Sequence, residues 1–251
     1  MDPVSLFKIN YKIELSDVDF NKKLRVSGLF KLFQDIASMA SDNLGFGIDT
    51  LKIKFGVAWV LMRIKVEVNK MPSLNEEILL ETWPIEPSKI EFERDFLVRD
   101  SKGEIIARAV STWAVIDLET RRLVKTERIS IKYPEQILSR AIDGRMRKLK
   151  SSGQMETVYK RVVGYSDIDF NGHVNNSKYV DFIMDCFDIE KHNKYTVKSI
   201  EVHFINEILP GNTITLNVDL TSSASNIVYI EGINEKDGRT VFRAHLVIKE
   251  R

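Results

Sequence analysis

Two spacings of apolar residues run through this chain and predict two kinds of element. Between residues 29 and 40, apolar side chains recur every three or four positions, as on the buried face of a helix. From residue 64, and again from residue 200, every second residue is apolar, which is typical of half-buried strands. These positions are Leu29, Leu32, Phe33, Ile36 and Ala40 for the helix, and Ile64, Val66, Val68, Ile200, Val202 and Phe204 for the strands. A helix followed by alternating strands predicts an α+β fold, in which the helix covers the apolar face of an antiparallel sheet.

The same order of elements occurs twice, which indicates an internal duplication. The segment "SDVDFN" from Ser16 returns as "SDIDFN" from Ser166, at an offset of 166 − 16 = 150 residues. The alternating segments match at an offset of 200 − 64 = 136, and two later turn glycines, Gly103 and Gly238, match at 238 − 103 = 135. Three matches in one order predict two domains, 1–137 and 157–251, joined by a crossover linker at 138–156.

The offset falls because the first half carries 150 − 136 = 14 additional residues after its helix. They lie around "SDNLGFGIDTLKIKF", which contains Gly45 and Gly47. This insert either walls or gates a pocket, or it forms an inert surface loop.

Charge and hydropathy argue against several classes of protein. Lys plus Arg number 37 against 36 Asp plus Glu, so a net charge of +1 gives no general attraction for nucleic acid or a membrane surface. The longest apolar run, 55–62, is far shorter than the roughly 20 residues that span a bilayer. The first residues lack the basic and apolar regions of a signal peptide, so we expect a cytoplasmic protein without a membrane span.

Cysteine and histidine usage limits the redox and metal chemistry. The single cysteine, Cys186, forms no internal disulfide, and the apolar spacing of Tyr179, Ile183 and Phe187 predicts that it is buried on a helix. The four histidines lack the paired spacing of metal ligands, so we expect neither a metal nor a cofactor.

The two copies of the duplicated segment differ in one chemically important position. The first has Lys23 where the second has His173. In the first copy we expect Asp19 and Asn21 to serve structure, by accepting hydrogen bonds from free backbone N–H groups ahead of the helix. In the second copy, Asp169, Asn171 and His173 lie within five residues, and a turn brings such side chains together. They either hold the turn or form a catalytic group that binds a carbonyl oxygen and moves a proton.

Glu207 is a second asymmetric candidate. It precedes a Pro-Gly turn in "EVHFINEILPGN", and its equivalent in the first half is Met71, since 207 − 136 = 71. A carboxylate at a strand end is usually solvated. Alternatively, the strand end approaches the helix N-terminus, where a partly buried Glu207 activates water.

These segments resemble the acyl-acyl-carrier-protein (acyl-ACP) thioesterase family along almost the whole chain. The resemblance is carried by "DxNxHVNNxKY" at 169–179, by "WVLMRIKVEVNKMPSLNEEILLETWP" and "RDFLVRDSKGEIIARAVSTWAVIDLETRRL" in the first half, and by "VHFINEILPGN" in the second. It implies a tandem double hotdog fold, each half a long helix wrapped by an antiparallel sheet. It also implies hydrolysis of the thioester between a fatty acyl chain and acyl carrier protein, which ends chain elongation and releases free fatty acid.

The resemblance places the family's catalytic network on Asp169, Asn171, His173 and Glu207. The second half then keeps the chemistry, while the first half holds the acyl chain. Plant members carry a cysteine next to the acid, but this chain has Ile208, so the mechanism expected here is direct attack by water. Residues that either wall an acyl tunnel or belong to the plain core are Phe30, Phe33, Trp59 and Trp83.

The implied partner, acyl carrier protein, is acidic and needs local basic groups to guide it. The linker group comprises Arg140, Arg145, Arg147, Lys148 and Lys150, and a second group comprises Arg121, Arg122 and Lys125. Acyl chain length and saturation are not readable from the sequence. Other readings are a hotdog acyl-coenzyme A thioesterase, a dehydratase or hydratase of that fold, and a non-catalytic acyl-binding module. A homodimer is also compatible with exposed sheet edges.

Overall fold

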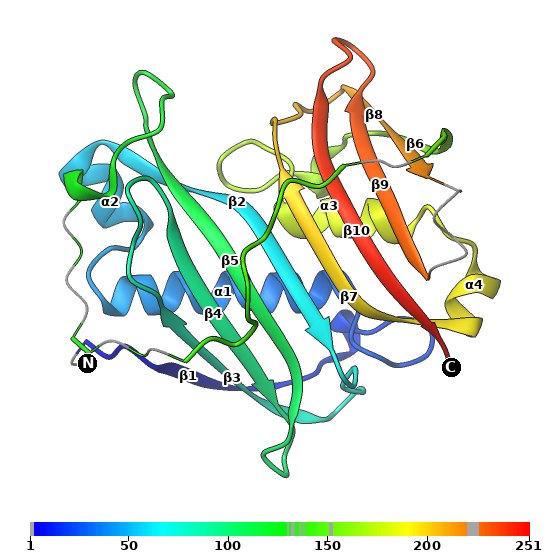
Figure 1. Ribbon diagram of the computed structural model, residues 1–251, viewed down its shortest axis with the longest axis horizontal. Coiled ribbons are helices and arrows are strands. Elements are labelled where there is room, and N and C mark those ends of the chain that lie inside the picture. Colours follow the sequence, from blue (N-terminus) through cyan, green and yellow to red (C-terminus); the bar gives the residue numbers. More distant parts are fainter. Residues whose placement is uncertain are drawn as a thin grey trace. The chain divides into compact units, whose positions relative to one another are not determined.

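The computed structural model describes residues 3–129, 131, 134, 135, 137, 139–150, 153–219 and 226–251. The chain forms two compact units, Met1–Arg145 and Met146–Arg251. Figure 1 labels their elements, which place helices against a sheet in each unit. The division between the units falls inside the predicted linker. Among the described residues, no helix is long and apolar enough to cross a membrane.

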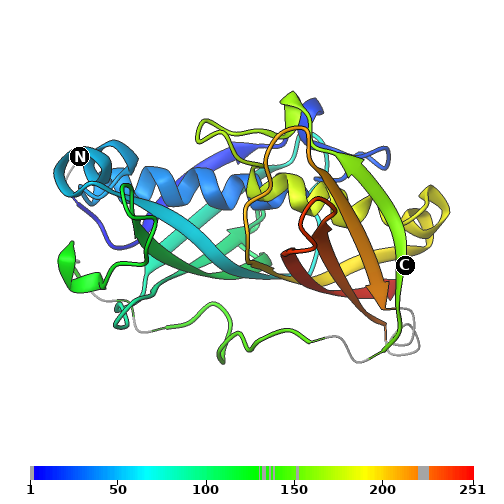
Figure 2. The same ribbon diagram turned by 90° about the horizontal axis from the view of Figure 1, so that it is seen from above.

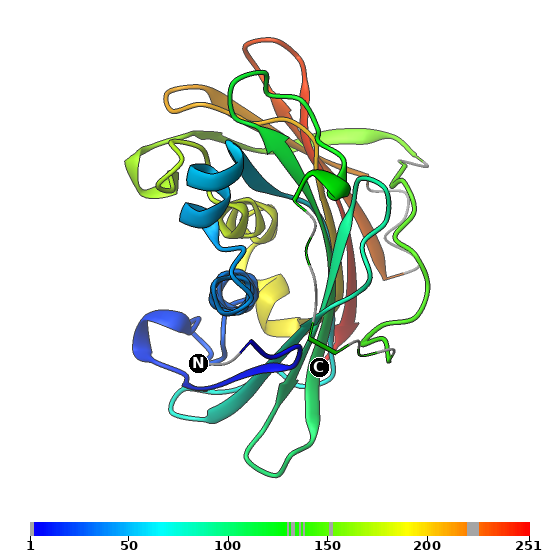
Figure 3. The same ribbon diagram turned by 90° about the vertical axis from the view of Figure 1, so that its left-hand side faces the viewer.

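The first unit is a five-stranded antiparallel sheet with two helices. Its strands are ordered β1-β3-β4-β5-β2, and each pairs antiparallel with its neighbour. Figure 3 shows α1 nearly end-on, with the sheet of this unit curved around it. Its elements are β1 (Phe7–Lys12), a 3₁₀ turn (Leu15–Asp17), α1 (Val26–Asn43), α2 (Ile48–Phe55), β2 (Val57–Val68), β3 (Glu77–Pro84), β4 (Phe92–Arg99), β5 (Ile105–Asp117) and a 3₁₀ turn (Thr126–Arg128).

The predicted apolar stripe is the face of α1 that packs on this sheet. Leu29, Leu32, Phe33, Ile36 and Ala40 are all buried. The ring of Phe33 lies 4.9 Å from that of Phe96 on β4, measured between centroids. The three-and-four spacing therefore identified both the helix and its buried face correctly.

The second unit repeats the first in strand order. Its sheet is ordered β7-β10-β9-β8-β6, which corresponds strand by strand to β2-β5-β4-β3-β1 of the first unit. Figure 2 shows α3 and the strands β8 to β10 as separate layers. Its elements are β6 (Met155–Val162), a 3₁₀ turn (Tyr165–Asp167), α3 (Asn176–Met184), α4 (Ile189–Lys194), β7 (Tyr195–Phe204), β8 (Thr213–Asp219), β9 (Ile227–Asn234) and β10 (Thr240–Glu250).

The insert of the first half forms the short helix α2. Leu51, at its centre, is fully buried in a cluster with Val57, Phe92, Val115 and Ile129. The insert is therefore a helix packed on the sheet through Leu51, rather than a loop. A role in walling a substrate pocket stays a prediction.

Cys186 does not lie on a helix, contrary to the prediction. The helix α3 ends at Met184. After it, Cys186 N–H donates to Ile183 O at 3.3 Å and Phe187 N–H donates to Met184 O at 3.1 Å, so each bond spans three residues instead of the four of an α-helix. The apolar spacing continues through Phe187, so the pattern alone overestimated the length of the helix. Cys186 is half-buried, and burial raises the pKa of its thiol to about 12.

The linker is not a purely solvated segment. Residues 139–150 form no helix or strand, yet Ile142 and Leu149 are buried. Arg140 donates to Asp95 at 3.0 Å and to Glu93 at 2.8 Å, within the first unit. Burial raises the pKa of Asp95, although the Arg140 guanidinium opposes this shift. Arg140 therefore anchors the linker to the first sheet, whereas the predicted linker residues 138, 151 and 152 lie outside the described residues.

Candidate active site

The residues 169–173 form a compact turn ahead of α3. Asp169 Oδ1 accepts a hydrogen bond from Asn171 N–H at 2.8 Å, and Asp169 N–H donates to His173 O at 2.9 Å. Gly172 closes the turn with φ +80°, a backbone conformation that suits glycine. The Asp169 carboxylate thus fixes the backbone that carries Asn171 and His173.

The first copy folds into the same turn without the histidine. Asp19 Oδ1 accepts from Asn21 N–H at 2.8 Å and from Lys23 N–H at 3.0 Å. Lys23 Nζ donates to Ser73 Oγ at 2.7 Å, and Lys22 occupies the left-handed position with φ +57°. The structural role predicted for Asp19 is observed, but it stabilises the turn rather than a helix end. The helix α1 begins later, at Val26, and its N-cap Arg25 makes no side-chain capping bond.

A buried carboxylate, that of Asp167, holds the turn of the second copy in place. Asp167, 1% exposed, accepts from Gly164 N–H at 2.9 Å and from Arg161 at 2.8 Å. Asn175 caps α3 by accepting from Ser177 N–H at 2.9 Å. The sequence assigned no role to either residue, although the first aspartate of "SDxDF" was the available signal. Together they fix the position of His173 relative to α3.

The structure brings His173 and Glu207 together. His173 Nε2 lies 3.1 Å from Glu207 Oε2, a hydrogen-bonding distance that also permits an ion pair when the imidazole is protonated. Glu207 follows the end of β7, and its side chain is 48% exposed. The side chain of His173 is 27% exposed. The acid and the imidazole therefore meet at a place that solvent reaches.

Asn171 and Asp169 lie on the same turn, in different surroundings. Asn171 is exposed, whereas Asp169 is half-buried and bonded to the Asn171 backbone. The Asp169 carboxylate therefore holds the backbone of Asn171 in the turn. Four predicted residues thus fall into a bonded pair, His173 with Glu207, and a bonded turn, Asp169 with Asn171.

Tyr179 is a site residue whose role the sequence did not reveal. It lies in the first turn of α3, is 4% exposed, and its hydroxyl accepts a hydrogen bond from the backbone N–H of Ile208. Burial raises the pKa of this phenol far above its usual range, and the nearby charges of Glu207 and Asp169 raise it further. The phenol is therefore neutral, and it ties α3 to the residue that follows Glu207.

Three of the four predicted tunnel residues are buried in the first unit. Phe30, Phe33 and Trp83 are 1%, 1% and 4% exposed. Trp59 is half-buried, donates from Nε1 to Phe46 O at 3.0 Å, and packs edge-on against Phe92. These contacts are those of core residues, and a role in holding an acyl chain stays a prediction. Across the described residues, no group of three or more His, Cys, Asp or Glu side chains is placed to hold a metal ion.

Comparison with known proteins identifies the family. Residues 4–131 match the acyl-ACP thioesterase N-terminal domain, and residues 150–249 match the acyl-ACP thioesterase C-terminal domain. The chain belongs to the acyl-ACP thioesterase family. The resemblance inferred from the motifs at 169–179 and 202–212 is thereby confirmed.

The relatives of this thioesterase family member come from plants and bacteria. The oleoyl-acyl carrier protein thioesterase 2 of Arabidopsis thaliana is 26% identical over 217 residues, which are 80% of this chain and 59% of that protein. An acyl-[acyl-carrier-protein] hydrolase of Cuphea viscosissima is 28% identical over 71% of this chain and 46% of its own length. The chain therefore spans about half to three fifths of the length of these curated relatives.

Solved structures confirm the predicted tandem double hotdog fold. An acyl-ACP thioesterase from Bacteroides thetaiotaomicron superposes with a TM-score of 0.85 and 28% identity, over 98% of both chains. The 12:0-ACP thioesterase from Umbellularia californica, 22% identical, gives a TM-score of 0.83 over 98% of each chain and shows the shared fold. The α+β class and the duplicated arrangement predicted from apolar spacing are therefore correct.

Proposed function

We propose that this chain hydrolyses fatty acyl-ACP thioesters to free fatty acid and acyl carrier protein, and so ends fatty acid synthesis. The observation that carries the proposal is the 3.1 Å contact between His173 Nε2 and Glu207 Oε2, beside the turn that presents Asn171. Membership of the acyl-ACP thioesterase family supports the substrate class.

The proposed reaction is direct attack by water on the thioester carbonyl carbon. Glu207 and His173 orient the water, and this pair takes up the proton as the new carbon–oxygen bond forms. The Asn171 amide and backbone N–H groups of the turn hold the negative charge that develops on the carbonyl oxygen. The carbon–sulfur bond then breaks, and the thiol of the carrier protein leaves with a proton.

Two further residues have positioning roles in this scheme. Asp169 holds the turn through Asn171 N–H, at 2.8 Å. Tyr179 holds Ile208 N–H and thereby fixes the backbone next to Glu207. Neither needs to touch the substrate, because each acts through the residue that it places.

The partner is proposed to dock through the exposed basic residues Arg122 and Lys125, which follow β5 in the first unit. Arg140 is a poor candidate, because Glu93 and Asp95 already bind its guanidinium. A homodimer and a cytoplasmic location remain predictions.

The decisive assay measures free acid released from a series of acyl-ACP thioesters of different chain lengths. The matched variant is His173→Ala, with acyl-coenzyme A of the same lengths as the competing substrate class. Release from acyl-ACP that disappears in the variant supports the proposal and gives the chain-length preference. Faster hydrolysis of acyl-coenzyme A than of acyl-ACP would indicate an acyl-coenzyme A thioesterase instead. Tight binding of acyl-ACP without release would indicate a binding module.

A further inference from the structure

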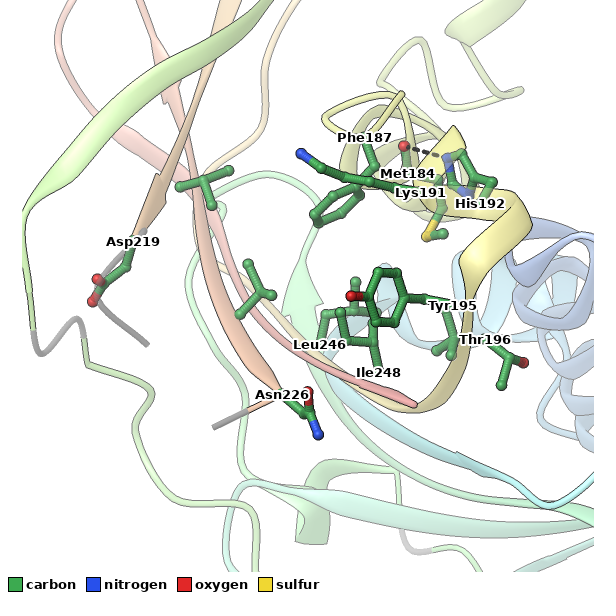
Figure 4. A pocket seen from close by; sticks show the side chains of 13 residues that line it. Met184, Phe187, Lys191, His192, Tyr195, Thr196, Asp219, Asn226, Leu246 and Ile248 are labelled. Carbon is green, nitrogen blue, oxygen red and sulfur yellow. Dashed lines mark hydrogen bonds between the residues drawn. The ribbon is translucent and has the colours of Figure 1, made fainter. Parts of the chain in front are cut away.

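The second unit contains a cavity of about 230 Å³ at the end of its sheet that lies away from the catalytic turn. Figure 4 shows side chains from α4 and from the strands around this space. Tyr195 and Val197 begin β7, whereas Glu207 follows its end, and Met184 ends α3, whereas His173 precedes its start. The apolar lining includes Met184, Phe187, Val197, Val228, Leu246 and Ile248.

The duplication explains why the cavity is open. Tyr195 is equivalent to Trp59, since 195 − 136 = 59. Phe92 lies opposite Trp113 on β5, and the equivalent of Trp113 is Ile248, since 248 − 135 = 113. Ile248 N–H donates to Asn226 O, so Asn226 stands where the first unit has Phe92. In the first unit the rings of Trp59 and Phe92 lie 4.9 Å apart, and Leu51 from the insert helix α2 is packed into the same cluster. The second unit has smaller side chains at these positions and no insert. The same part of the duplicated sheet is therefore filled in one unit and open in the other.

The shorter helix of the second unit contributes to the opening. α1 has 18 residues, whereas α3 has 9 and ends at Met184. The six-residue α4 follows and brings Lys191 and His192 to the rim of the cavity. His192 Nε2 is already bonded to Met184 O at 3.1 Å, so it braces the rim rather than facing a ligand.

The composition of the cavity defines the ligand that it fits. Its walls are mainly aliphatic and aromatic, and its volume lies below the roughly 300–1,000 Å³ of pockets that enclose a drug-sized molecule. A slim, unbranched chain suits this space better than a ring system. Lys191 is exposed at the rim and only loosely paired with Asp188, at 3.9 Å. Figure 4 shows Asp219 on a different side of the cavity from Lys191, so the cationic side favours an anionic head group.

We propose that this cavity binds a free fatty acid, with its chain against the apolar walls and its carboxylate beside Lys191. The site is separate from the candidate active site. The side chains of Tyr179, Phe182 and Ile183, exposed by 4%, 1% and 0%, fill the buried face of α3 between the two places. An acyl chain held at His173 thus has no open route along this face to the cavity. The choice of a fatty acid rests on the proposed function, which produces that compound.

The test is isothermal titration of the full chain with dodecanoate below its micelle concentration. We expect saturable binding that includes one molecule at this cavity. Val228→Phe enlarges a buried side chain of the lining, and it should remove that binding event or weaken it at least tenfold. Ile248→Trp is a second filling variant, and it introduces the residue of the first unit, Trp113, since 248 − 135 = 113. Lys191→Glu should weaken binding about tenfold, a difference of about 1.4 kcal/mol.

Two control variants separate this site from other causes. Lys194→Glu makes the same charge change on α4 at an exposed residue that does not line the cavity, and it should alter the affinity less than twofold. His173→Ala should abolish hydrolysis and leave this binding event intact. If melting temperatures show that both filling variants fold, and both still bind dodecanoate with the affinity of the original chain, the proposal is overturned. If hydrolysis fails but the cavity variants behave as expected, the proposed function falls and the fatty acid site stands.

Discussion

The hydroxyl of Tyr179 accepts a hydrogen bond from the backbone N–H of Ile208, the residue after Glu207. This bond joins the first turn of α3 to the segment that follows β7. The ring of Tyr179 is held by Phe204 and Phe242, at centroid distances of 5.8 Å and 5.5 Å. Glu207 is thus positioned from two sides, by its own contact with His173 and by the anchored backbone of its neighbour.

Replacing Tyr179 with Phe should lower kcat while leaving KM nearly unchanged. The ring remains, but Ile208 N–H loses its buried acceptor, which costs about 1–3 kcal/mol of folding free energy. Glu207 then moves more freely relative to His173, and we expect kcat to fall by about tenfold, since about 1.4 kcal/mol corresponds to that factor. The measurements are steady-state kinetics on acyl-ACP and a thermal unfolding curve.

The control for this variant is Tyr229→Phe, which removes a buried tyrosine hydroxyl on β9. It should lower the melting temperature without changing kcat, because Tyr229 packs edge-on against His245 rather than against the catalytic turn. A Tyr179→Phe enzyme that is destabilised but retains full kcat would reduce the role of Tyr179 to stability alone.

Replacing Glu207 with Gln should lower kcat by about 10²–10⁴, the usual contribution of general base catalysis. Glutamine keeps the size of the side chain and its contact with His173 but cannot accept the proton from water. Because the two residues act as a pair, the double variant with His173→Ala should lose little more activity than either single variant. Near-normal turnover by Glu207→Gln would remove this residue from the mechanism.

The first copy offers a control that also removes a carboxylate charge, Asp19→Asn, at the residue equivalent to Asp169. Asp19 stabilises a turn that carries Lys23 instead of a histidine. We expect wild-type kcat and a small loss of stability, measured by the same assays. A large loss of kcat in this variant would show that the first turn takes part in the chemistry.

The sequence was sufficient for the fold because each half repeats the same apolar spacings in the same order. The stripe from Leu29 to Ala40 and the alternation from Ile200 to Phe204 correspond to α1 and β7. The end of α3 could not be read in this way. Phe187 continues the helical spacing, but the helix ends at Met184. The next backbone hydrogen bonds span three residues instead of four, and the pattern of side chains does not determine this change.

The candidate site was predictable only in part. His173 and Glu207 were recognisable because the first half lacks both, and the structure places them in contact. The exposure of Glu207 depends on where β7 ends relative to the turn, which no local spacing encodes. The role of Tyr179 depends on a backbone N–H 29 positions further along, since 208 − 179 = 29, and a backbone group leaves no mark in the sequence.

Reversing two charges after β5 should weaken the use of acyl-ACP selectively. Arg122→Glu combined with Lys125→Glu places negative charge where the acidic carrier protein is proposed to dock. We expect KM for acyl-ACP to rise about tenfold at low salt, and the difference to shrink at high salt as screening increases. Turnover of a small acyl thioester that lacks the carrier protein should be unchanged. Lys102→Glu, in the exposed turn before β5, is the control. An unchanged KM at low salt would exclude Arg122 and Lys125 as the docking residues.

Cys186 should be dispensable for catalysis and slow to react with alkylating agents. Burial raises the pKa of its thiol to about 12, and the neighbouring Asp185 carboxylate adds to this shift. The thiol is therefore protonated at neutral pH, while the thiolate is the reactive species. We expect the rate of iodoacetamide labelling to be far below that of an unhindered thiol at pH 8 and to keep rising as the pH approaches 10.

Cys186→Ser should retain kcat, since Ile208 occupies the place next to Glu207 and the mechanism uses water. Rapid labelling at pH 7 accompanied by loss of activity would contradict both expectations and would make a cysteine nucleophile the better account of the chemistry.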